Sequence, residues 1–159
     1  MAYQALLRGL VAGAAGVAAM TAGEKLEQAF TRRPNSFVPA HTLARLLRLQ
    51  HPDADAVGRN WAMHWGQGIL LGAARGLMAE RGLRGPVGAL LFANLRLLND
   101  QALENATGAG APPWTWPVDE QLIDIAHKGV YAVITGLVAD RLIAGPPGIP
   151  APRRPWAVR

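Results

Sequence analysis

Four long apolar segments constrain the fold of this chain more than any other feature of its sequence. They cover residues 3–30, 60–80, 86–105 and 118–144. In each segment apolar residues recur at spacings of three and four, which is the period of an amphipathic helix, and each segment is too long for a strand. Strict alternation of apolar and polar residues is absent, and there is no hairpin signal. The sequence therefore predicts an all-α protein with four long helices.

Prolines and glycines separate these segments and set their order in space. Pro34 follows the first segment, Gly85-Pro86 forms a tight turn between the second and third, and Trp116-Pro117 precedes the fourth. Short connections favour antiparallel neighbours, so the pattern predicts an up-down-up-down bundle over residues 1–145. The pattern also predicts a short amphipathic helix at residues 39–49, between the first and second long helices. Residues 146–159 form a Pro-rich basic tail.

An uncharged stretch of the first segment, residues 9–23, favours a position in a membrane. A transmembrane helix needs about 20 mostly apolar residues. Small-residue grooves let helix backbones approach closely in lipid, and two segments carry GxxxG spacings, formed by Gly9, Gly13, Gly68, Gly72 and Gly76. These glycine faces serve contacts either within one chain or between copies in a homo-oligomer. We therefore expect an antiparallel four-helix transmembrane bundle, multi-pass in the cell membrane and surrounded by membrane lipids.

Two other interpretations of the apolar segments stay open. The mean hydropathy is only +0.11, and an Ala- and Gly-rich soluble bundle gives a similar pattern. Residues 6–19 have the length of the apolar region of a signal peptide, but no clear basic stretch precedes them. We therefore expect the first segment to belong to the mature fold.

The composition excludes several classes of function. Sixteen basic and eleven acidic residues give a net charge of +5, but the basic residues do not form one stripe with interleaved aromatic residues, which argues against nucleic-acid binding. The chain has no cysteine, which excludes thiolate catalysis, Cys-ligated zinc and iron–sulfur clusters. No phosphate-binding loop, nucleotide fingerprint, nucleophile elbow or zinc-protease motif is present, so we expect no cofactor.

The charges divide between the two ends of the predicted bundle. The first and third long helices end, and the second and fourth begin, at one end, which we call the acidic pole. All eleven acidic residues except Glu80 and Asp140 fall there. The opposite end, the arginine-rich pole, holds both termini together with Arg8, Arg81, Arg84 and Arg141. Positive charge beside membrane helices favours the cytoplasmic side, so we expect cytoplasmic termini.

Polar side chains from all four segments gather at the acidic pole. Asp124 and His127 are three residues apart and share a helix face, and Asp100 and Glu104 are four apart. Ionisable groups at membrane depth are costly and usually point inward, where they are paired or functional. The candidate catalytic residues are His127, Asp124, His64, Asp100 and Glu104. The candidate ligand-binding residues are Glu24, Gln67, Asn99, Tyr131, Trp65, Trp114 and Trp116.

Three interpretations of this cluster compete. The first is structural: the carboxylates pair with neighbouring basic residues and lock the bundle. The second is a pocket that binds a small or lipid-like ligand or a partner. Its enzymatic alternative is acid–base chemistry on an apolar substrate, with His127 oriented by Asp124, His64 opposite, and Asp100 or Glu104 as the second carboxylate. The third is a metal site, but the chain has one acid-x-x-His and no second copy, so we expect none. The tryptophans suit either an interfacial belt or a ligand lining.

The second half of the chain resembles the YagU-like family of small bacterial inner-membrane proteins. The resemblance spans residues 64–142 and rests on motifs in a fixed order. These are Ala79-Glu80, Gly110-Ala111-Pro112-Pro113, Trp116-Pro117, Glu120 and Asp124-Ile125-Ala126-His127. It implies a helical integral membrane protein and supplies no substrate. The segment 24–48 has no counterpart in that family.

Overall fold

The computed structural model describes residues 2–144, and all of their regular structure is helical. The prediction of an all-α protein is therefore confirmed for this part of the chain. The expected Pro-rich tail lies outside the described residues. The elements are α1 (Ala2–Thr31), α2 (Val38–Leu46), α3 (Val57–Glu80), α4 (Gly85–Thr107), the short 3₁₀ helix η1 (Pro113–Thr115) and α5 (Val118–Ala144).

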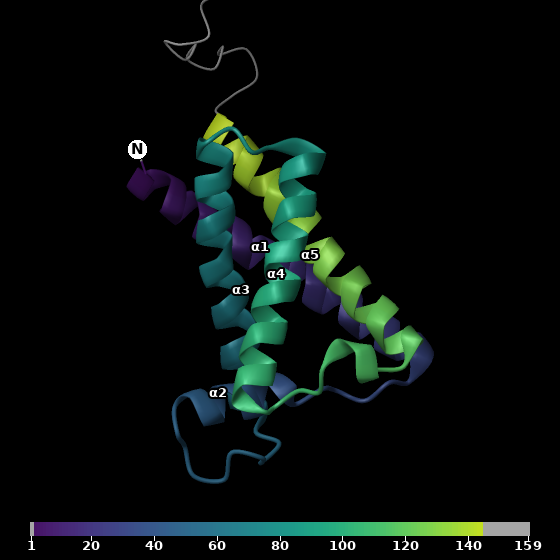
Figure 1. Cartoon of the computed structure of the whole chain (residues 1–159). Coiled ribbons are helices and arrows are strands. Elements are labelled where there is room, and N and C mark those ends of the chain that lie inside the picture. Colours follow the sequence, from purple (N-terminus) through teal and green to yellow (C-terminus); the bar gives the residue numbers. More distant parts are fainter. Residues whose placement is uncertain (1, 145–159) are drawn as a thin grey trace, which may run out of the picture.

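The four long helices alternate in direction along the chain, but they do not form an evenly packed bundle. Helix α1 packs against α3 and α5, whereas α3 and α4, although consecutive, touch only slightly. Figure 1 shows α1 and α5 running diagonally to α3 and α4. The two pairs lie close together near the N-terminus and diverge toward the end that carries α2. The acidic pole is thus the wide end of the molecule.

The close contact between α1 and α3 is made by glycines. A Cβ atom on Gly13 would lie 2.7 Å from the carbonyl oxygen of Gly68, and one on Gly72 would lie 2.5 Å from the Cα atom of Gly13. Any larger residue at these positions would therefore push the two backbones apart. Both glycine faces are occupied within one chain, so a homo-oligomer would need a different surface.

The apolar core lies between the helices, next to the glycine contact. Val17, Met20, Phe92 and Tyr131 form its centre. The Tyr131 hydroxyl donates a hydrogen bond to the carbonyl oxygen of Gly68 at 2.6 Å, and its ring lies 5.5 Å from that of Phe92. We expected Tyr131 to contact a ligand, but the structure places it in the core because its hydroxyl finds a backbone acceptor there.

The arginine-rich pole is closed by a buried ion pair. Arg75 of α3 is fully buried, and its Nη2 lies 2.7 Å from Oδ1 of Asp140 on α5. The other carboxylate oxygen of Asp140 accepts a hydrogen bond from the backbone nitrogen of Gly85, in the first turn of α4. This one pair therefore ties together α3, α4 and α5.

Two of the described helices, α1 and α5, are long and apolar enough to cross a membrane, and the core helix of a soluble protein can pass the same test. The expected four-helix transmembrane bundle thus has two candidate spans, since α3 and α4 do not qualify. Large apolar side chains are nevertheless exposed on all the long helices. On α4 and α5 they include Leu90, Leu91, Leu95, Leu98, Val130, Val133 and Leu137.

Candidate functional site

A cavity of about 480 Å³ lies at the acidic pole, where the helices diverge. Side chains of all five α-helices line it, together with the segment 33–37 that follows α1 and the segment 109–117 that precedes α5. Of the candidate residues, those that line it are Glu24, His64, Trp65, Gln67, Asp100, Glu104, Trp116, Asp124 and His127. Segments far apart in the sequence therefore meet here, and His64 and His127 share one cavity.

Three candidates lie elsewhere. Tyr131 is in the core, as described above. Trp114 is 79% exposed on η1, so its ring points to the surroundings. Asn99 is absent from the cavity lining, and its buried Nδ2 has no hydrogen-bond partner among the described residues.

A compact group of charged residues, which we call the central cluster, forms one wall of the cavity. It consists of Arg96, Asp100, Asp124 and Lys128. The Lys128 Nζ lies 2.6 Å from Oδ1 of Asp124 and 3.2 Å from Oδ2 of Asp100. The Arg96 Nε lies 3.1 Å from the same Asp100 oxygen, and Gln67 donates to the other Asp100 oxygen at 2.7 Å. Two cations and two carboxylates are thus matched across α4 and α5, which supports the structural interpretation for these residues.

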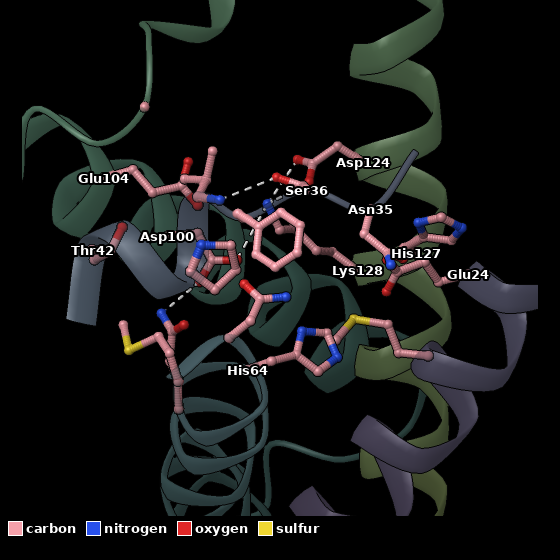
Figure 2. A pocket seen from close by; sticks show the side chains of 18 of the residues that line it. Glu24, Asn35, Ser36, Thr42, His64, Asp100, Glu104, Asp124, His127 and Lys128 are labelled. Carbon is pink, nitrogen blue, oxygen red and sulfur yellow. Dashed lines mark hydrogen bonds and ion pairs between the residues drawn. The ribbon is translucent and has the colours of Figure 1, made fainter. Parts of the chain in front are cut away.

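Asp124 does not orient His127 as we expected, because it belongs to the central cluster. Asp124 bonds to Lys128, and no hydrogen bond joins it to His127 within the described part of the chain. Lys128 lies one helical turn from Asp124, and its ammonium group takes the place on the carboxylate that we expected His127 to occupy. Figure 2 shows the His127 ring beside Glu24, away from Asp124. The expected Asp124–His127 pair is therefore not formed.

His64 and Glu104, on α3 and α4, lie outside the two candidate spans. The Nε2 atom of His64 is 3.1 Å from the Thr21 hydroxyl oxygen. Burial lowers the pKa of His64, so its ring is neutral at pH 7. The Glu104 carboxyl has neither an ion pair nor a hydrogen bond with any described residue, and burial raises its pKa to about 7. The cavity therefore holds a neutral imidazole and a carboxyl group that is only partly ionised near pH 7.

The structure adds Trp61, Phe37 and Thr42 to the wall, which the sequence analysis did not single out, and it places Trp61 beside the candidate Trp65. The rings of Trp61 and Trp65 are stacked, with centroids 6.1 Å apart and an angle of 9° between their planes, and both line the cavity. Phe37 and Thr42 line it from the segment around the start of α2. The four-residue spacing of the two tryptophans is a helical signal that could have paired them. Nothing in the sequence places residues 33–37 across the cavity.

No group of three or more His, Asp or Glu side chains among the described residues is positioned to hold a metal ion. Comparisons of the chain with family models, with curated proteins and with solved structures find no match. The resemblance to the YagU-like family therefore stays a prediction, and the function has to be argued from the site itself.

Proposed function

We propose that this chain is a small integral membrane protein that binds a small or lipid-like ligand in the cavity at its acidic pole. One observation carries the proposal: helices with broad exposed apolar surfaces diverge around a cavity whose wall is both apolar and ionisable. The cavity volume of about 480 Å³ falls within the range of roughly 300–1,000 Å³ that ligand sites occupy.

The exposed apolar side chains support a membrane location. Leu90 and Leu98 on α4 are 65% and 69% exposed, and Leu122 on α5 is 62% exposed. Many exposed large apolar side chains are unusual on soluble monomers when they gather in one patch, whereas lipid tails cover them at no cost. In our proposal α1 and α5 cross the membrane and the arginine-rich pole faces the cytoplasm.

In the same proposal the acidic pole lies at the boundary between membrane and water. The hydrocarbon core of a bilayer is about 30 Å thick, whereas α1, with 30 residues at about 1.5 Å each, is about 45 Å long. The charged end of α1, which carries Glu24 and Glu27, therefore extends beyond the hydrocarbon. The tryptophans and α2 then lie at the level of the lipid head groups, where amphipathic side chains are common.

An enzymatic function is the second candidate. The observation that favours it is that His64 and Glu104 line one cavity with protonation states suited to exchanging protons near pH 7. The expected acid–base site also needed His127 oriented by Asp124, and that pair is not formed. Ligand binding is therefore the function that the site supports better.

The proposal is tested by purifying the protein in detergent and identifying bound molecules by native mass spectrometry. Leu103→Trp fills the cavity, and Leu98→Trp places the same ring on the exposed face of α4 as a matched control. We expect a lipid-like molecule to remain bound to the wild type and to Leu98→Trp and to be lost from Leu103→Trp. Recovery of the protein from the soluble fraction without detergent, or equal retention by both variants, would overturn the proposal.

A further inference from the structure

The cavity wall carries almost no charge that is not already matched. Arg96 and Lys128 are balanced by Asp100 and Asp124 within the central cluster. At the outer edge the Arg33 guanidinium lies 3.1 Å from Glu27 and 3.6 Å from Glu120. A ligand with a charged head group would bring a further charge into a partly buried site in which most opposite charges are already paired, which is unfavourable.

The two glutamates without an ion pair do not alter this balance much. Glu104 is only partly ionised near pH 7, because burial raises its pKa to about 7. Glu24 accepts a hydrogen bond from Gln28 and is followed in sequence by Lys25, whose ammonium group donates only to the neutral side chains of Gln28 and Asn35. The wall as a whole is therefore close to neutral.

Besides Arg96 Nε, which lies 3.1 Å from Asp100, three buried polar atoms of residues in this wall have no hydrogen-bond partner among the described residues. They are Oγ1 of Thr42, Nη1 of Arg96 and Nε1 of Trp65. Thr42 is fully buried and Arg96 is 4% exposed, so solvent does not readily satisfy them. They belong to cavity-lining residues of three different elements, α2, α4 and α3, respectively. Two are donors and one is a hydroxyl that can donate or accept, so a group that satisfies them all must offer several acceptors, and hydroxyl groups can do so in either direction at Thr42.

A flat aromatic surface completes the wall. The stacked rings of Trp61 and Trp65 present extended apolar faces, and one of these rings also carries the unpartnered Nε1 donor. A flat ring with carbon–hydrogen bonds on its faces and hydroxyl groups at its edge, as in a pyranose, packs its faces on such a surface and directs its hydroxyl groups outward.

We propose that the ligand is an amphiphile with an uncharged, hydroxyl-rich head group of the sugar or polyol class, bound against Trp61 and Trp65. This inference rests on the proposed function, because it names the chemical class of the ligand for that same cavity. Hydroxyl groups of the head group bond to Thr42, Arg96 and Trp65, and the apolar tail leaves between the diverging helices.

The test compares four amphiphiles with the same twelve-carbon chain. The protein is reconstituted in phospholipid nanodiscs, and empty nanodiscs correct for partitioning into the lipid. The probes are dodecyl glucoside, a dodecyl ether of tetraethylene glycol, dodecyltrimethylammonium and dodecyl phosphate. We expect the glucoside to bind at least about tenfold more tightly than each of the others, because a site built for hydroxyl groups rejects ligands that lack them.

Substitutions localise the effect. Thr42→Val removes one unpartnered hydroxyl at nearly constant volume, and we expect glucoside affinity to fall about tenfold. Trp61→Ala removes part of the aromatic surface from a half-exposed position that is safer for folding, with a similar expected loss. Trp114→Ala is the matched control, since Trp114 does not line the cavity. Unchanged glucoside affinity in Trp61→Ala would overturn the assignment even if Thr42→Val failed to fold.

The outcomes separate this inference from the proposed function. Equal binding of all four amphiphiles, or tighter binding of a charged one, would overturn the sugar or polyol class while leaving a ligand-binding cavity in place. Binding of none of them above the empty-nanodisc level would overturn both.

Discussion

Both ends of the described part of this molecule contain a buried arginine paired with an aspartate, but the cavity described above lies at the acidic pole. At the arginine-rich pole Arg75 pairs with Asp140, and glycines close around the guanidinium group. A Cβ atom on Gly88 would lie 3.2 Å from its Nη2, and one on Gly136 would lie 3.3 Å away. At the acidic pole Arg96 pairs with Asp100, and the helices around them diverge. The comparison teaches that the size of the neighbouring residues and the spread of the helices, not the ion pair, decide whether space for a ligand remains.

Breaking the Arg75–Asp140 pair gives the largest expected loss of stability. Asp140→Ala leaves the fully buried Arg75 without a counter-charge, so we expect the free energy of unfolding to fall by about 3–5 kcal/mol. Unfolding of the reconstituted protein by denaturant measures the loss. The double variant Arg75→Met with Asp140→Leu should recover most of it. Asp53→Ala, in an exposed pair, is the control; a loss as large there would contradict the assignment to burial.

Disrupting the glycine contact between α1 and α3 gives the next largest expected loss of stability. Gly72→Ala introduces a Cβ atom 2.5 Å from the Cα atom of Gly13, and we expect a loss of about 1–3 kcal/mol from the forced separation of α1 and α3. Gly66→Ala is the matched control on the same helix, because nothing lies within 4 Å of its added Cβ atom. Alanine is the better helix former, so this control should leave stability unchanged or slightly raised. Equal losses in both variants would refute the close contact.

Glu104, at the acidic pole, has a smaller expected effect on stability, and this effect depends on pH. The pKa of Glu104 is about 7 in the folded protein and near the ordinary value of 4.5 when unfolded, so the folded state holds the extra proton between these values. Its contribution to stability is therefore fully present below pH 4.5 and is lost as pH rises to 7. After allowance for partial solvent access, we expect the wild type to lose about 1–2 kcal/mol over this range relative to Glu104→Gln. Parallel stability curves for the two proteins would show that Glu104 is not buried as described.

The helices and the gathering of polar residues at one pole could be predicted from the sequence. The helical spacing of apolar residues and the Pro and Gly residues between segments locate the long helices. The alternating direction of these helices brings His64 and His127 to one cavity. Within the cluster, spacing allowed Asp124 to reach either His127 or Lys128, and only the three-dimensional positions decide between them.

Other features depended on helix packing that no single segment encodes. The glycine faces of α1 and α3 fit each other, which spacing alone could not distinguish from a contact between copies. The angle between the two helix pairs, and hence the cavity, arises from the close approach at one end and the bulkier side chains at the other. Tyr131 shares a helix face with Asp124 and His127, but its depth in the core depends on the position of Gly68 on another helix.

The contact between Gly13 and Gly72 also fixes a point where α1 and α3 approach each other closely. Backbone meets backbone there, so no side chain can rearrange to let the helices slide or separate. From Gly13 to the end of α1 at Thr31 the helix extends for about 27 Å at roughly 1.5 Å per residue. A rotation of about 5° around this point would move the far end of α1 by about 2 Å, given that length. A small change in the tilt of α1 about this contact would therefore change the width of the cavity more than the spacing of the helices at the glycines.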